Sequence, residues 1–282
     1  MLKDLEEVYF PENLADAIQK RKEYARAAAV IAGGTDIVTD PPPGIRCLID
    51  ITRLGLDRIR ETTDHICLGA TITMQQLATS PQATSLGGGL LARSSCEGWP
   101  TPVRNAATLG GNLAGAGPFA DTPPALLALD AQAVVFDEAG EGVIPVEEFF
   151  VDYRTTAVGD GILTEVRVPK TPANARGVFV KLAPTPVDQA LVNLAVYIEF
   201  EDGCCRVARI AIGAVTRTPR RVPEAEEVLR AQPLERRVIQ RAETVLTEAV
   251  EPILDMRASA DYRRRMSGVL VRRALTMLAP AS

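Results

Sequence analysis

Two glycine-centred segments hold the residue types best suited to bind a charged ligand. They are Ala32-Gly33-Gly34-Thr35-Asp36 and Thr108-Leu109-Gly110-Gly111-Asn112, and each stands where an apolar run meets a loop. Paired glycines let backbone N–H groups approach a ligand without interference from a Cβ atom, and successive N–H groups form a concavity that suits an anionic pyrophosphate. Threonine and asparagine add neutral hydrogen-bonding groups. Together the segments predict a dinucleotide clamp, whereas either one alone is equally typical of an ordinary turn.

The elements around the first segment place it at the end of a strand. Residues 13–28 predict an amphipathic helix, 29–32 a strand that leads into the glycines, and 46–51 a further strand. Pro41-Pro42-Pro43-Gly44 excludes a helix directly after the loop. No Gly-x-Gly-x-x-Gly sequence opens a helix. We therefore expect loops from two subdomains, rather than a single helix N-terminus, to form the site.

The rest of the chain mixes strands and helices without a regular strand-helix-strand alternation, which indicates an α+β fold. Before a boundary at about 170–175 we predict four extended segments, at 65–70, 133–136, 143–146 and 162–168. We also predict two short helices there, at 73–78 and 125–129. The second glycine segment is predicted to be a loop that follows a helix. Beyond the boundary we predict three strands, at 178–182, 191–200 and 206–215, and two helices, at 234–249 and 261–278. Glu201-Asp202-Gly203 predicts a hairpin turn.

The last predicted helix carries both an apolar stripe and many arginines. The stripe consists of Tyr262, Met266, Val269, Leu270, Met277 and Leu278. The arginine set is more typical of a solvated face than of a docking surface, and comprises Arg263, Arg264, Arg265, Arg272 and Arg273. Trp99, among glycine and prolines, is predicted to fill a gap in the core rather than to shield a ligand.

Composition indicates a globular protein. The chain has 282 residues, of which 46% are hydrophobic and 24% charged, and its formal net charge is −5. A negative balance argues against nucleic acid or an anionic membrane as the main partner. The first residues lack an apolar signal core, and no apolar run is long enough to span a bilayer. We therefore expect a cytoplasmic protein.

The cysteines and the single histidine leave few options for metal or covalent chemistry. The five cysteines are scattered and include no Cys-x-x-Cys pair, so neither a disulfide framework nor a metal cluster is expected. His65 lies in a predicted strand, where a structural imidazole is the expected role. Redox chemistry in this chain would therefore need an organic cofactor.

Residues 108–131, which continue the second glycine segment, resemble the FAD-binding (medium) subunit of molybdenum hydroxylases such as xanthine dehydrogenase, aldehyde oxidase and aerobic carbon monoxide dehydrogenase. The resemblance runs nearly end to end, with further matches at Arg104-Asn105, Phe149-Phe150, Tyr153-Arg154-Thr155 and residues 255–264. It implies an α+β fold: a two-subdomain FAD-binding domain of the PCMH/vanillyl-alcohol-oxidase type, followed by a small domain with a three-stranded antiparallel sheet plus helices. The implied domains are 1–170, with subdomains about 1–55 and 56–170, and 176–282.

The resemblance also implies which residues bind FAD. The first pyrophosphate loop would be Ala32, Gly33, Gly34, Thr35 and Asp36, and the second would hold Thr108, Gly110, Gly111 and Asn112. Asp121 matches an acidic residue that binds hydroxyls of the cofactor, and Gly115 a position that offers only backbone. Leu163 and Lys181 fall where similar proteins place residues near the flavin and its adenosine end. From the residues alone, Asp36 could equally be a turn residue and Lys181 a surface charge.

Such a subunit would be the electron outlet of a complex. The implied partners are a small subunit with two [2Fe–2S] clusters and a large molybdopterin subunit, and the acceptor would be NAD⁺ or another molecule. No catalytic acid, base or metal ligand is expected in this chain. Two departures from the family pattern bear on flavin access: Trp99-Pro100-Thr101-Pro102, and the lack of basic residues after Lys181. The alternatives are a free-standing FAD-dependent oxidoreductase and a non-catalytic scaffold subunit.

Overall fold

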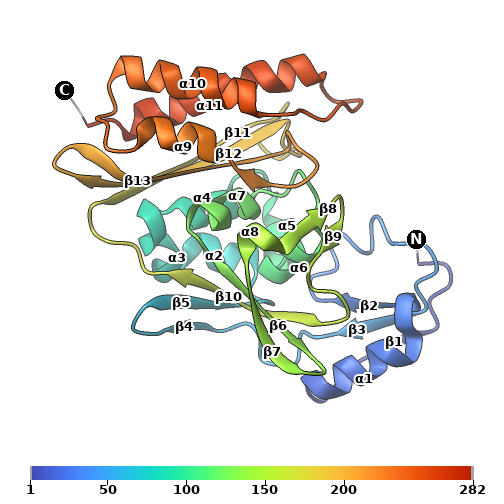
Figure 1. The fold of residues 1–282 in the computed structure, drawn as a ribbon. Helices are drawn as coiled ribbons and strands as arrows, with labels where there is room; N and C mark the ends of the chain where they lie inside the picture. The colour runs from blue at the N-terminus through green and yellow to red at the C-terminus, as the bar shows by residue number, and fades with distance from the viewer. Residues whose placement is uncertain (1, 281–282) are drawn as a thin grey trace.

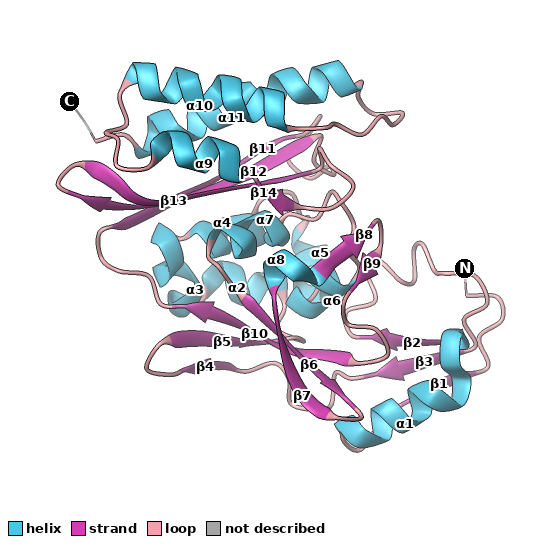
Figure 2. Cartoon of the chain, viewed as in Figure 1, coloured by secondary structure: helices cyan, strands magenta, loops and turns pink. Residues whose placement is uncertain are grey.

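The structure is a computed structural model that describes residues 2–280. Figures 1 and 2 show, from bottom to top, a five-stranded sheet, a layer of short helices, a four-stranded sheet and an outer layer of three helices. A smaller N-terminal lobe lies beside the lower layers. No helix within residues 2–280 is both long and apolar enough to cross a membrane.

The N-terminal lobe is a parallel sheet covered by one helix. Its strands pair in the order β1-β3-β2 and are Glu7–Tyr9 (β1), Ala28–Ile31 (β2) and Cys47–Asp50 (β3). Helix α1 (Leu14–Tyr24) begins where the Asn13 side chain accepts a hydrogen bond from the Asp16 N–H at 2.9 Å. A 3₁₀ turn, Ala25–Ala27, joins it to β2. The lobe has a small core of its own, which positions the end of β2.

The central sheet is antiparallel throughout, in the order β4-β5-β10-β6-β7. Its strands are Ile59–Glu61 (β4), His65–Gly69 (β5), Gln132–Asp137 (β6), Gly140–Pro145 (β7) and Ile162–Pro169 (β10). A short hairpin of Phe150–Asp152 (β8) and Thr155–Thr156 (β9) stands apart from this sheet. The four extended segments predicted before the boundary all form strands, and β4 was not predicted.

Short helices form the middle layer. They are Met74–Thr79 (α2), Pro81–Ser85 (α3), Leu90–Cys96 (α4), Thr101–Ala106 (α5), Leu109–Ala114 (α6), Thr122–Ala128 (α7) and Val146–Phe149 (α8), with a 3₁₀ turn at Leu86–Gly88. Thr73 caps α2 in a reciprocal pair with Gln76. Prolines in the first turn, where a missing N–H costs nothing, start α3, α5 and α7.

The C-terminal sheet is buried on both faces, so β12 is apolar almost throughout. Its strands are Ala175–Leu182 (β11), Val192–Glu201 (β12), Cys204–Gly213 (β13) and Arg220–Arg221 (β14). Ala195 and Tyr197 belong to the core shared with the short helices, whereas Leu194 and Val196 face the outer helices. The outer helices are Pro223–Leu229 (α9), Arg236–Ala249 (α10) and Ala260–Leu278 (α11).

The predicted α+β class is therefore confirmed, with one correction to the C-terminal domain. Its sheet has four strands instead of three, because β14 adds a two-residue edge strand to β13. Helix α9 was also missed, since its seven residues are too few to show helical periodicity. The predicted hairpin turn is present: Asp202 and Gly203 join β12 to β13 with φ of 50° and 78°.

The predicted solvated arginine face of the last helix is wrong for Arg263, which is fully buried. Its guanidinium donates to the carbonyls of Leu191 and Ala214, both at 2.5 Å, and to Asp255 at 2.8 Å. Met277, assigned to the apolar stripe, is 60% exposed instead. The buried stripe runs through Arg263, Ser267, Leu270, Val271, Ala274, Leu275 and Leu278. Helical spacing places an arginine with fixed partners on the buried face as readily as a leucine.

Asp255 is expected to stabilise the fold in a pH-dependent way. Burial opposes its ionisation, but hydrogen bonds from Arg257 and Arg263 outweigh that effect and lower its pKa to about 2. Because the folded pKa lies below the unfolded value of about 3.9, this stabilisation is complete above pH 4 and is lost as pH falls towards 2. We expect the free energy of unfolding to fall by about 1–2 kcal/mol over this range, a value kept small because Asp255 is partly exposed. In the Asp255→Asn variant, this pH-dependent loss should be absent from urea unfolding measured between pH 5 and pH 2. The same pH dependence in the variant and the wild type would contradict the role of Asp255.

Candidate dinucleotide site

The first glycine segment forms a loop directly after β2, at the carboxyl end of a parallel strand. No backbone carbonyl within residues 2–280 accepts a hydrogen bond from the N–H groups of Gly33, Gly34, Thr35 or Asp36. Gly34 turns the chain with φ of 69°, a conformation that favours glycine. Four neighbouring free donors in one loop form the kind of concavity that binds an anion.

Gly33 brings the two glycine segments into contact. A Cβ atom on Gly33 would overlap the carbonyl group of Ala106 and lie 3.2 Å from the Cα atom of Ala107. Ala107 directly precedes Thr108, the first residue of the second segment. Glycine at this position therefore serves the packing of one backbone against another. The sequence pattern suggested either approach to a ligand or an ordinary turn, and carried no sign of this packing.

The predicted loop at the second segment is wrong, because Thr108 begins helix α6. Its hydroxyl oxygen accepts a hydrogen bond from the Gly111 N–H at 3.2 Å. The N–H groups of Leu109 and Gly110 donate to the carbonyls of Ile72 and Ala70, at 2.9 and 2.8 Å. These donors hold α6 against the end of β5 and are occupied within the protein. Of the two loops expected to form the site, therefore, only the first is a loop, and the second segment is the start of a helix.

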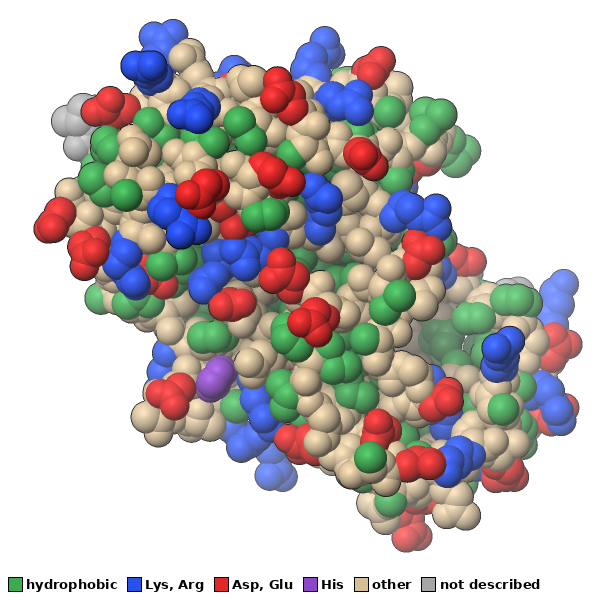
Figure 3. All heavy atoms as spheres, in the orientation of Figure 1, with side chains coloured by type: hydrophobic (Ala, Val, Ile, Leu, Met, Phe, Trp, Pro, Cys, Tyr) green, Lys and Arg blue, Asp and Glu red, His purple; other side chains and the backbone are tan. Residues whose placement is uncertain are grey.

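The far end of α6 lies against the first loop. A Cβ atom on Gly115 would be 3.4 Å from Oδ2 of Asp36. Oδ1 of Asn112 accepts a hydrogen bond from the Thr122 hydroxyl at 2.5 Å, which positions the side chain at the start of α7. The structure thus brings Gly33 against Ala106 and Asp36 against Gly115, from two distant parts of the sequence. Figure 3 shows the surface hollowed between the N-terminal lobe and the rest of the molecule.

Asp121 and Lys181 form a buried ion pair, so the alternative of a surface charge at Lys181 is wrong. Nζ of Lys181 lies 2.7 Å from Oδ2 of Asp121, and the two side chains are 6% and 4% exposed. The Asn193 amide donates to Oδ1 of Asp121 at 2.7 Å. Burial raises the pKa of the Asp121 carboxyl above its usual value, against the opposing effect of Lys181 and Asn193. Each carboxylate oxygen keeps a lone pair for a ligand hydroxyl.

Asn193 was not identified from the sequence, although two signals mark it. It is a polar residue within the otherwise apolar start of β12, and it pairs directly with Lys181 across β11 and β12. Both residues lie on the sheet face that carries Phe179, Ala195 and Tyr197 towards the short helices. Two glycines make room for them: a Cβ atom on Gly98 would overlap Lys181, and one on Gly213 would overlap Asn193.

A cavity of about 310 Å³ opens beside Lys181. It is lined by Glu97, Gly98, Lys181 and residues 183–186. Leu163, by contrast, offers a ligand no polar side-chain group. It is buried at the start of β10, in the same core as Leu109 and Leu113 of α6. Trp99 packs against that core, as predicted, and its indole N–H is buried without a partner among the described residues.

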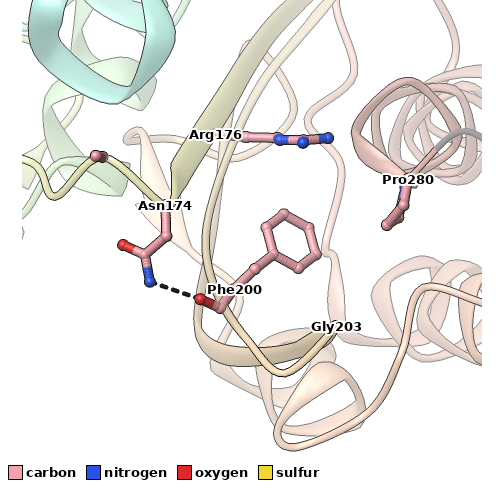
Figure 4. A pocket seen from close by; sticks show the side chains of 6 residues that line it. Asn174, Arg176, Phe200, Gly203 and Pro280 are labelled. Carbon is pink, nitrogen blue, oxygen red and sulfur yellow. Dashed lines mark hydrogen bonds between the residues drawn. The ribbon is translucent and has the colours of Figure 1, made fainter.

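A second cavity of about 270 Å³ lies at the other end of β11 (Figure 4). There the Cζ atom of Arg176 lies 5.6 Å from the centroid of the Phe200 ring. The Asn174 amide donates to the Phe200 carbonyl at 2.5 Å on one side of the cavity, and Ala173, Gly203 and Pro280 complete the lining. This cavity shares no residue with either glycine segment.

Two family models cover almost the whole chain. The FAD binding domain in molybdopterin dehydrogenase matches residues 3–171, and the CO dehydrogenase flavoprotein C-terminal domain matches residues 179–278. The chain belongs to the FAD-binding (medium) subunit family of molybdenum hydroxylases. FAD is accordingly its cofactor, and the chain is a subunit of the oxidoreductase class that this family forms.

Relatives of this FAD-binding family align with nearly the full chain. The nicotine 6-hydroxylase medium subunit of Paenarthrobacter nicotinovorans is 30% identical over 87% of this chain and 88% of its own length. The carbon monoxide dehydrogenase medium chain of Afipia carboxidovorans is 27% identical over 94% and 93%. Among solved structures, carbon monoxide dehydrogenase from Hydrogenophaga pseudoflava superposes with a TM-score of 0.94 at 28% identity, covering 98% of each chain.

The residues present fit the FAD of this family. The free N–H groups of Gly33 to Asp36 suit a diphosphate, and the Asp121 carboxylate suits sugar or ribityl hydroxyls. Three buried polar groups without partners among residues 2–280 lie in or next to these parts of the site: the Thr71 hydroxyl, beside the Ala70 that holds α6, the Trp99 indole, beside Gly98, and Oδ1 of Asn193, whose amide donates to Asp121. Buried polar groups normally have partners, so unpartnered groups here are consistent with a ligand.

Proposed function

We propose that the two glycine segments hold FAD and that this chain is the electron outlet of a molybdenum hydroxylase complex. The observation that carries the proposal is the cluster of free N–H groups at Gly33 to Asp36, packed through Gly33 against Ala106 and Ala107, which directly precede the second glycine segment. Bound FAD would supply electron transfer in steps of one or two electrons. The further proposed contacts are Ala32, Thr108, Gly110, Gly111, Asn112, Gly115, Asp121, Leu163 and Lys181.

In this proposal each part of the chain has a separate task. The first loop binds the diphosphate, while α6 supports it through Gly115 and the Asn112 side chain. Asp121 orients hydroxyl groups, and Lys181 favours the charged form of that carboxylate, against the opposing effect of burial. Residues 1–170, with subdomains about 1–55 and 56–170, would form the FAD-binding domain, and 176–282 would cover it.

The proposed partners are a [2Fe–2S] small subunit that delivers electrons and a molybdopterin large subunit that oxidises the substrate. The proposal is supported by relatives described as medium subunits or medium chains. NAD⁺ is the proposed acceptor, with another acceptor as the alternative. A xanthine dehydrogenase-like enzyme is one form that such a complex takes.

The visible absorption spectrum of the purified chain tests the function. We expect a yellow protein that releases FAD on denaturation and bleaches with NADH in the absence of oxygen. FAD without bleaching would contradict NAD⁺ as the acceptor. A folded, colourless protein that refuses added FAD would support the scaffold alternative, and reduction by an organic substrate in the absence of partner subunits would support a free-standing enzyme.

Gly111→Leu tests the site itself. Gly111 is exposed, and a Cβ atom there would meet only the Thr108 hydroxyl, at 2.9 Å. The leucine side chain would fill the space in front of α6, so we expect loss of flavin from a chain that still folds. Flavin content and circular dichroism measure the two properties. Wild-type flavin content in this variant would disprove the proposed site.

A further inference from the structure

Arg154 lies at the tip of the β8–β9 hairpin, which Figure 1 shows on the side of the helical layer nearest the N-terminal lobe. Tyr153 and Arg154 form the turn between the paired residues Asp152 and Thr155. The Arg154 N–H donates to the carbonyl of Ala116, just beyond α6, at 3.2 Å. The backbone of Arg154 is thus fixed to the second segment, while its side chain extends to the first.

The first glycine loop carries two carboxylates, and Arg154 is the cation placed against both. Its guanidinium lies 2.9 Å from Asp40 and 3.7 Å from Asp36, and no other Lys or Arg within residues 2–280 pairs with either carboxylate. Two carboxylates beside the free N–H groups would repel a diphosphate, which is itself doubly negative. A loop that binds such an anion therefore needs a compensating positive charge.

The backbone conformation of Arg154 is costly for an arginine. Its φ is 51°, in the left-handed region that glycine adopts without strain and that other residues seldom occupy. Glycine would make this turn more stable, so the turn itself gives no reason for an arginine. Strain of this kind persists where a residue has another role.

We propose that Arg154 is a further FAD-binding residue, whose charge allows the acidic first loop to accept the diphosphate. The inference rests on the proposed function, which assigns the diphosphate to that loop. The hairpin is also tied to the C-terminal domain, because Arg217 donates to both oxygens of Asp152, at 2.8 and 3.1 Å. This exposed ion pair connects the hairpin that carries Arg154 to the C-terminal domain.

Arg154→Gly separates the charge from the turn, since it removes the guanidinium and relieves the positive φ. Titration of the flavin-free chain with FAD should show affinity weakened by about tenfold or more at low salt, and by less at high salt. The melting temperature without flavin should not fall. Arg154→Lys should retain most of the affinity. Arg230→Gly, an equal charge change at an exposed position paired with Glu227, should bind FAD as the wild type does.

Wild-type FAD affinity in Arg154→Gly would overturn the inference, as would a loss that is equal in Arg154→Lys and independent of salt. Gly111→Leu distinguishes the two proposals. If that variant loses FAD while Arg154→Gly retains it, only the inference about Arg154 fails. If both retain FAD, the diphosphate does not lie in this loop and the proposed site fails as a whole.

Discussion

Replacing Gly33 by alanine is expected to cost the protein its FAD and about 3 kcal/mol or more of its free energy of unfolding. The new Cβ atom would overlap the carbonyl of Ala106, and the adjoining backbone has no freedom to yield. The Ala107 N–H donates to Val103 at 2.7 Å, and the Ala107 carbonyl accepts from Met74 at 2.9 Å. The two segments would have to separate. Urea unfolding and flavin content per chain measure both losses.

Gly142→Ala is the matched control. It lies in β7, where a Cβ atom would meet only the Val135 carbonyl, at an ordinary 3.8 Å. We expect a change within about 0.5 kcal/mol and full flavin content. If Gly33→Ala unfolds at the wild-type urea concentration and keeps its FAD, the two segments do not pack as described.

Replacing Lys181 by methionine is expected to destabilise the protein by about 3–5 kcal/mol at neutral pH, because it leaves the Asp121 carboxylate buried without its cation. The pKa of Asp121, already raised by burial, would rise further. A folded pKa above the unfolded value means that the folded chain binds the proton more tightly. The penalty should therefore shrink as pH falls from 8 to 5 and grow as it rises. Urea unfolding across that range measures it.

A double variant and an exposed pair complete this test. Asp121→Leu combined with Lys181→Met removes both charges, so it should cost less than the sum of the single changes. Lys170→Met breaks a pair with Glu61 whose side chains are 36% and 58% exposed, and should change stability by less than about 1 kcal/mol. Equal costs for Lys170→Met and Lys181→Met would show that the buried pair has no special energetic role.

Much of the local structure could be predicted from the sequence because its causes are local. The Asp202-Gly203 turn, the start of α2 at Thr73 and the proline-led α7 follow from residues within a few positions of each other. Three strands of the C-terminal sheet, β11 to β13, were recognisable from their apolar runs, whereas the two-residue β14 was not. The two glycine segments and the resemblance around residues 108–131 sufficed to predict the family and its cofactor, which the family models bear out.

The departures from prediction arise where distant residues meet. Thr108 begins a helix because Ile72 and Ala70 accept the N–H groups that follow it, and sequence periodicity carries no sign of those acceptors. Arg263 is buried because carbonyls of Leu191 and Ala214 and the Asp255 carboxylate surround its guanidinium. Lys181 is buried because the fold places Asp121 beside it.

The sequence by itself predicted which residues could contact a dinucleotide, because glycines and small polar side chains at the end of an apolar run suit a pyrophosphate. The tertiary structure decided which of their donors stay free. Gly33 to Asp36 keep unpaired N–H groups, whereas Leu109 and Gly110 donate theirs to the carbonyls of Ile72 and Ala70, in the turn after β5. The physical reason is that a backbone donor binds a ligand only where folding supplies no nearer acceptor, and the nearest acceptor is set by packing between segments far apart in the chain.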